Sequence, residues 1–131
     1  MLPDYCMFCH CFNISDLQWL IVAGGADGSD SFMASTEILR LTNNENGNWI
    51  EKTSLPKVLG CLSGATLYGY FRVFGGWQAD GKGSNDIFTW NHHSEEWMTE
   101  NLSIDSTVYP GGVYHHAVTE ASFTQLEDFC D

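Results

Sequence analysis

The chain has 131 residues and a mass of 14.6 kDa, which is the size of one ordinary domain. Its 5 basic and 17 acidic side chains give a formal net charge of −12, so nucleic acids and anionic membrane surfaces would repel it. The composition, 44% hydrophobic and 17% charged, is typical of a globular protein. Aromatic residues at 14% and 13 glycines favour β-structure with many turns.

The first half of the chain contains four predicted strands, at residues 9–14, 19–23, 37–41 and 49–52. The second of them is an uninterrupted apolar run that ends at Gly24-Gly25, as expected for a strand buried on both faces. A polar loop rich in Gly, Asp and Ser follows this Gly pair. The dipeptide Asn46-Gly47 predicts a hairpin turn before the fourth strand.

The second half repeats this order, with strands predicted at residues 62–67, 70–74, 86–90 and 97–100. Gly75-Gly76 follows the first Gly pair, and Trp97 follows Trp49, at a spacing of about 50 residues. A period of this length built only of strands predicts four-stranded blades that stack on one another. We therefore divide the chain into an extension (1–8), two repeats (9–60 and 61–113), and a partial third repeat with a tail (114–131).

These landmarks resemble the Kelch-repeat family, whose repeat has an apolar strand ending in Gly-Gly, a loop, a strand with a Tyr, and a Trp. In this chain the matching residues are Gly24, Gly25, Gly75 and Gly76 for the Gly pairs, Leu41 and Trp90 for the Tyr, and Trp49 and Trp97 for the Trp. The resemblance implies an all-β fold of Kelch-type antiparallel four-stranded blades, that is, a partial β-propeller. Because closed propellers have about 4–8 blades, two repeats predict a fragment of a larger propeller or a chain that associates with itself.

The resemblance also implies a non-catalytic module that binds a protein partner through loops at one end of the blades. The candidate binding residues after the Gly pairs are Asp27, Ser29, Asp30, Ser31, Trp77, Gln78, Asp80, Lys82 and Asn85. Those in the segments that follow each Trp strand are Ser54, Lys57, Tyr109 and Tyr114. The acidic charge predicts a partner with a basic segment. We expect the Gly pairs to permit close backbone packing, and Trp49 and Trp97 to be buried between blades.

Two other classes of function remain open. A propeller enzyme of the galactose-oxidase type uses a Tyr–Cys crosslink on a complete ring, and nothing in this sequence marks such a pair. A small metal-binding protein would use Cys6, Cys9, Cys11 and a His, because thiolate and imidazole suit zinc. Residues 6–10 also spell the CxxCH of haem attachment, but we expect no cofactor. Residues 76–83 nearly spell a phosphate-binding loop, yet they lack the final hydroxyl, and a strand is predicted to follow.

The cysteines and the N-terminal residues bear on the compartment. Five cysteines are an odd number, so a closed set of disulfides would leave one over. The first twelve residues lack the basic segment of a secretory signal, which favours a reducing, cytoplasmic location, with an extracellular location as the alternative. The longest apolar runs are too short to span a bilayer.

Overall fold

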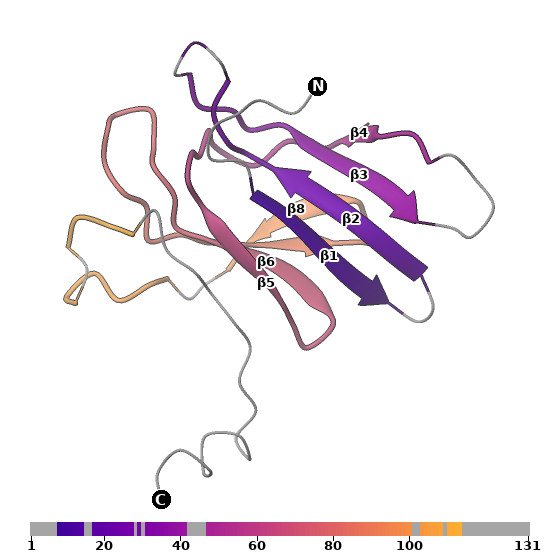
Figure 1. The fold of residues 1–131 in the computed structure, drawn as a ribbon. Helices are drawn as coiled ribbons and strands as arrows, with labels where there is room; N and C mark the ends of the chain where they lie inside the picture. Colours follow the sequence, from indigo (N-terminus) through magenta and orange to yellow (C-terminus); the bar gives the residue numbers. More distant parts are fainter. Residues whose placement is uncertain are drawn as a thin grey trace, which may run out of the picture.

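The computed structural model describes residues 8–14, 17–27, 29, 31–41, 47–100, 103–108 and 110–113. These residues form two antiparallel four-stranded sheets (Figure 1). Sheet 1 has the order β1 (Phe8–Ile14), β2 (Leu17–Ala23), β3 (Thr36–Leu41) and β4 (Ile50–Lys52). Sheet 2 has the order β5 (Ser63–Leu67), β6 (Tyr70–Phe74), β7 (Ile87–Asn91) and β8 (Glu96–Thr99). The eight predicted strands are confirmed, each close to its expected bounds. No helix among these residues is long and apolar enough to cross a membrane.

Tight turns set the register of sheet 2. Tyr68 and Gly69 join β5 to β6 and both have positive φ angles, 51° and 79°, as a two-residue type I′ hairpin requires. In the turn between β7 and β8, the side-chain oxygen of Asn91 accepts hydrogen bonds from the backbone N–H groups of His93 (2.9 Å) and Ser94 (3.2 Å). This side chain therefore satisfies backbone donors that the hairpin leaves without strand partners.

The two sheets share one hydrophobic core. Its buried members are Ile21, Ala23 and Ile38 from sheet 1, Leu55, Leu59 and Leu62 from the connecting segment, and Phe71, Val73, Phe88 and Trp90 from sheet 2. The strand register places the sheet 1 members on one face, because Ile21 pairs directly with Ile38. In the same way Phe71 pairs with Trp90 and Val73 with Phe88, which places these four residues of β6 and β7 on the face directed at sheet 1. Each fully buried large side chain contributes about 1.5–3 kcal/mol through burial.

Of the two repeated tryptophans, Trp97 lies in this interface and Trp49 does not. The Trp97 ring packs edge-on against Trp90 (centroids 5.3 Å apart), and its indole N–H donates to Thr36 Oγ1 of sheet 1 at 3.0 Å. Trp49 is 38% exposed, so the prediction that both tryptophans are buried between blades is wrong for Trp49. Both residues lie on corresponding faces of their sheets. In sheet 2, the face that carries Trp97 packs against sheet 1. In sheet 1, none of the described strands packs on the face that carries Trp49.

Both Gly pairs adopt the same left-handed backbone conformation. The φ angles are 66° and 103° at Gly24 and Gly25, and 63° and 105° at Gly75 and Gly76. A Cβ atom at Gly24 would lie 2.6 Å from the carbonyl oxygen of Leu59, closer than real Cβ contacts. The structure thus confirms the predicted close packing at the exit of β2, because a side chain would be both strained and sterically excluded there.

Candidate functional site

Loops gather at the end of the sheets where β2 and β6 finish (Figure 1). We use the name loop surface for the described residues within 24–35, 53–62, 75–86 and 103–113. This end contains the candidate residues that follow the two Gly pairs. The hairpins that join β5 to β6 and β7 to β8 lie at the opposite end of the strands.

Backbone hydrogen bonds hold the segments of the loop surface together. The N–H of Gly25 donates to the carbonyl of Leu59 at 2.8 Å, which joins the first two segments. Gly60 and Trp77 exchange a pair of bonds of 2.9 and 2.6 Å, which joins the second segment to the third. Gly76 N–H donates to the carbonyl of Val113 at 2.8 Å, which joins the third to the fourth. The four segments therefore form one continuous, internally bonded surface.

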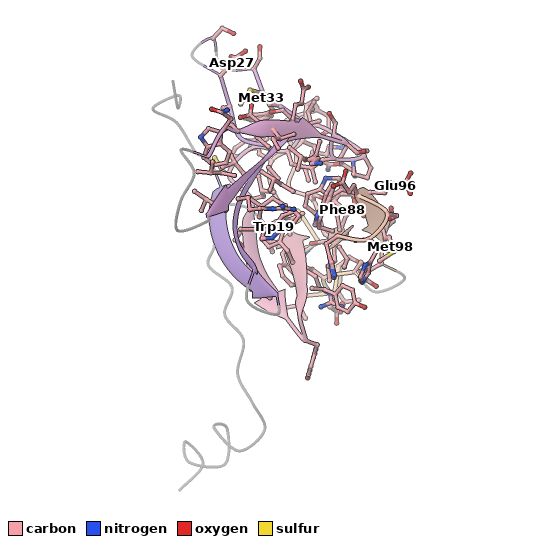
Figure 2. The ribbon with its side chains drawn as sticks, turned by 90° about the vertical axis from the view of Figure 1, so that its right-hand side faces the viewer. Trp19, Asp27, Met33, Phe88, Glu96 and Met98 are labelled. Carbon is pink, nitrogen blue, oxygen red and sulfur yellow. The ribbon has the colours of Figure 1, made fainter. Side chains whose placement is uncertain are left out.

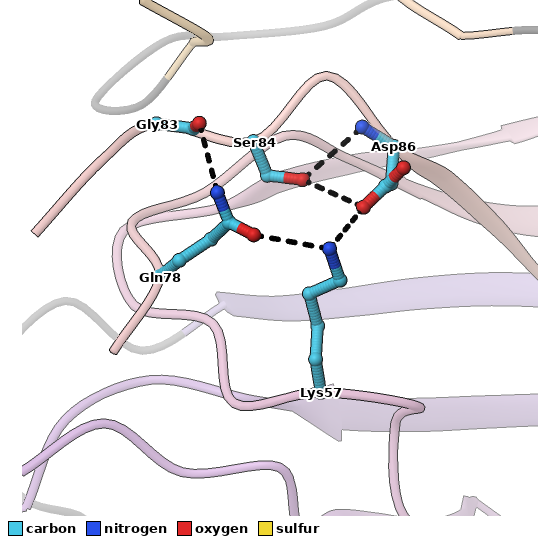
Figure 3. A network of polar contacts seen from close by, with 5 residues as sticks. All are labelled: Lys57, Gln78, Gly83, Ser84 and Asp86. Carbon is cyan, nitrogen blue, oxygen red and sulfur yellow. Dashed lines mark hydrogen bonds and ion pairs between the residues drawn. The ribbon is translucent and has the colours of Figure 1, made fainter. Parts of the chain in front are cut away.

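Lys57 connects the segment between the sheets to the loop that follows β6 (Figure 3). Its amino group donates to Gln78 Oε1 at 3.0 Å and also contacts the carboxylate of Asp86. The buried hydroxyl of Ser84 donates to the same carboxylate oxygen at 3.1 Å, and Gln78 Nε2 donates to the carbonyl of Gly83 at 3.1 Å. Of these five residues, the sequence pattern identified Lys57 and Gln78 as binding candidates. In the structure their polar groups first serve to order the loop.

Aspartates hold the turns of the loop surface. Asp27 Oδ1 accepts hydrogen bonds from the Ser29 backbone N–H (2.9 Å), the Ser29 hydroxyl (2.7 Å) and the Ser31 N–H (3.1 Å). Asp105 Oδ1 accepts from the backbone N–H and the hydroxyl of Thr107, at 2.8 and 2.6 Å. The serine hydroxyl lowers the pKa of Asp27, and the threonine hydroxyl lowers the pKa of Asp105, because each bond stabilises the carboxylate. Both side chains are therefore negatively charged at neutral pH.

The other candidate residues differ in exposure. Asp80 and Lys82 are exposed in the loop after β6, where the Lys82 backbone N–H donates to Asp80 Oδ1 at 3.0 Å. Trp77 and Asn85 are partly buried against the sheets, while Ser54 is exposed. Three further candidates, Asp30, Tyr109 and Tyr114, lie outside the described residues.

A pocket that sequence reasoning did not identify lies near the rim of the interface between the sheets, toward the hairpin end. It has a volume of ≈ 350 Å³ and is lined by Trp19, Ile38, Arg40, Gly47, Asn48, Ile50, Lys52 and Glu95. The Lys52 amino group bridges the two sheets through bonds of 2.8 and 2.9 Å to the Glu95 carboxylate, and the Arg40 guanidinium lies 5.0 Å from the Trp19 ring centroid. No sequence signal could have found it, because Lys52 and Glu95 are 43 residues apart.

The alternative metal and phosphate sites receive no support from the described residues. Among them, no group of three His, Cys, Asp or Glu side chains is placed to hold a metal ion. The side chains of Cys6, Cys9 and Cys11 lie outside the described part. Cys61 forms a disulfide bond. The strand predicted after residues 76–83 is confirmed as β7, so the helix that a phosphate-binding loop requires does not follow it.

No family model matches the chain. No curated protein matches it either. Among solved structures, the chain is similar to YjhT, with a TM-score of 0.64 and 18% sequence identity over 92% of this chain. The chain spans 32% of the length of that protein, which has a β-propeller-like fold. The likeness and the two four-stranded sheets together show that this chain has an all-β fold compatible with a partial β-propeller.

Proposed function

We propose that the chain is a Kelch-type module, part of a larger propeller assembly, that binds a protein partner through the loop surface and carries out no catalysis. The observation that supports this proposal most is the bonding of the four loop segments into one surface above two rigid sheets. Binding residues are frequently found on loops that a rigid scaffold positions. The repeated Gly pairs and their matching φ angles support a Kelch-type arrangement of these loops.

The charge of the loop surface indicates what kind of partner would fit it. Asp27 and Asp105 are negatively charged, and Asp80 and Asp105 are exposed, whereas the amino group of Lys57 already binds Gln78 and Asp86. Lys82 is the exposed cation of the loop after β6. Together with a net charge of −12, this excess of carboxylates favours a partner segment rich in Lys or Arg.

The proposal can be tested with displayed peptides that are selected for binding to the full chain. We expect the selected peptides to be basic and to lose affinity at least tenfold when Asp27, Asp80 and Asp105 are all changed to Asn. Asn keeps a side-chain oxygen that accepts the same turn hydrogen bonds, so the substitution removes charge with little change to the turns. Glu96→Gln is the matched control, because it removes one carboxylate from β8, outside the loop surface.

Two results would contradict the proposal. The first is selection of peptides that bind the triple Asn variant and the parent equally well. The second is loss of binding in the Glu96→Gln control, which would place the binding site on the sheet. A measured association rate that falls steeply between low and high salt would support the electrostatic part of the proposal.

A further inference from the structure

We propose that two or more copies of this chain pack head-to-tail, with the outer face of sheet 1 in one copy against the outer face of sheet 2 in the next. The outer face of sheet 1 consists of Leu20, Val22, Glu37, Leu39, Trp49 and Glu51. The outer face of sheet 2 consists of Tyr70, Arg72, Phe74, Ile87, Thr89, Asn91, Glu96, Met98 and Glu100. These surfaces are separate from the loop surface, so this inference does not depend on the proposed function.

The contact between the two sheets of one chain supplies the pattern for the contact between copies. Sheet 2 packs on sheet 1 through the face that carries Phe88, whose counterpart by strand register in sheet 1 is Glu37, and the four residues Phe71, Val73, Trp90 and Trp97. One repeat earlier, the corresponding residues are Leu20, Val22, Leu39 and Trp49, which are the apolar residues of the outer face of sheet 1. This face therefore has the pattern of a face that packs on a blade. Yet Trp49 is 38% exposed, and none of the described strands covers it.

The outer face of sheet 2 has the complementary pattern. The face of sheet 1 that receives sheet 2 includes Trp19 and Ile50, and the corresponding residues of sheet 2 are Tyr70 and Met98. Tyr70 and Met98 are 40% and 41% exposed, so two large apolar side chains of this face are open to solvent. Figure 2 shows Met98 at the side of the molecule away from the strands of β1 and β2.

The charged residues of the two faces do not add to the contact. Glu37 and Glu51 are directly opposite each other on β3 and β4, and both are exposed, so their carboxylates repel each other. Arg72 lies on the outer face of sheet 2, with its guanidinium 5.7 Å from the Tyr70 ring centroid and 3.5 Å from Glu100 Oε1. Arg72 is thus already paired with Glu100, and Glu96 adds a second carboxylate to this face, so the contact rests on the apolar residues of the two faces.

A head-to-tail contact uses two different surfaces, so it leads to a ring when the rotation between copies closes, and to a chain of copies when it does not. Closed propellers contain about 4–8 blades. Because the described residues of each copy form two four-stranded sheets, a ring closed by these sheets alone would contain two to four copies. Such a ring would leave the loop surfaces of all copies at the same end, where a partner could contact several at once.

The test uses two variants, each of which blocks one face with a charge. Trp49→Glu blocks the outer face of sheet 1, and Met98→Glu blocks the outer face of sheet 2. Both positions are more than a third exposed, so the variants should fold, and a far-ultraviolet circular dichroism spectrum identical to that of the parent verifies this. Val108→Glu is the matched control, because it replaces another exposed apolar residue, at 61%, outside both faces.

Light scattering after size exclusion gives the mass of each species, and non-reducing electrophoresis identifies any copies joined by disulfides. We expect the parent and Val108→Glu to form assemblies of two to four copies, and each blocking variant alone to be a monomer of 14.6 kDa. An equimolar mixture of the two blocking variants should form dimers and nothing larger, because each supplies the face that the other lacks.

Three outcomes would overturn the proposal. A parent that stays monomeric at a concentration of about 100 μM would show that the dissociation constant of the contact between copies lies well above this value, which is too weak for the proposed assembly. Loss of assembly in only one blocking variant, with no rescue on mixing, would indicate that a single face pairs with its own copy. Loss of assembly in Val108→Glu would place the contact on the loop surface instead.

Discussion

The two repeated tryptophans should differ sharply in their contribution to stability, although their sequence contexts are nearly the same. Replacing a large core aromatic residue by Ala costs about 3–5 kcal/mol. Trp97 is partly buried against Trp90 and Phe71, at centroid distances of 5.3 and 6.0 Å, so we expect Trp97→Ala to cost about 3 kcal/mol. Trp49 is 38% exposed, and we expect Trp49→Ala to cost no more than about 1 kcal/mol.

The hydrogen bond of Trp97 can be separated from its packing. Trp97→Phe keeps an aromatic ring but leaves the Thr36 hydroxyl, whose residue is 0% exposed, without its indole donor. Combining it with Thr36→Val in a double-mutant cycle should give a coupling energy of about 0.5–1.5 kcal/mol, the usual value of one hydrogen bond.

Urea unfolding followed by circular dichroism measures these free energies, at a concentration where light scattering shows the chain to be monomeric. This condition matters because Trp49 also belongs to the proposed contact between copies. Equal losses for Trp49→Ala and Trp97→Ala would refute the assignment of Trp97 alone to the interface between the sheets. A coupling energy near zero would refute the role of the Thr36 bond.

Three further substitutions and one titration test other parts of the structure. Gly24→Ala should lower the free energy of unfolding by about 2 kcal/mol, because a Cβ there meets the Leu59 carbonyl. Gly69→Ala, also at positive φ but with open space around it, should cost about 1 kcal/mol, and equal losses would contradict the packing argument. Lys57→Met should cost at most about 1 kcal/mol, since such a partly exposed pair is screened by water, but it should speed amide exchange in the loop after β6. Burial and then the charge of His93 lower the pKa of His92 in the folded chain. Between this pKa and the ordinary value of about 6.5 the unfolded chain binds more protons, so the free energy of unfolding rises with pH over that range. An NMR titration midpoint for His92 at or above about 6.5 would be inconsistent with this.

Much of the fold could be predicted from local sequence patterns. Apolar runs that end in Gly-Gly predicted β2 and β6, and the structure has both strands followed by glycines at positive φ. This works because a buried strand needs apolar residues along its length, and the sharp exit after it needs residues without a Cβ atom. The spacing of about 50 residues then predicted that sheet 2 repeats sheet 1, which the strand orders confirm.

The surroundings of each side chain could not be predicted in the same way. Trp49 and Trp97 occupy equivalent positions, and only the arrangement of the sheets decides which of them is covered. The ion pair of Lys57 with Asp86 and that of Lys52 with Glu95 join segments far apart in the chain, so no local pattern marks them. The described candidate residues of the loop surface lie in loops, but the sequence did not reveal that Gln78 is engaged within the loop itself.

The acidic pair on sheet 1 is a departure from the repeat that has a measurable cost. Thr99 of sheet 2 corresponds to Glu51, which lies directly opposite Glu37, so Glu51→Thr removes the repulsion by introducing the residue of the other repeat. We expect a gain of about 0.5 kcal/mol in the free energy of unfolding of the monomer at low salt. The gain should shrink at 1 M salt, where the screening length falls to about 3 Å.

Glu96→Gln is the control, since its cross-strand neighbour Asn91 is neutral and no change in stability is expected. A monomer that is no more stable at low salt would contradict the repulsion between Glu37 and Glu51.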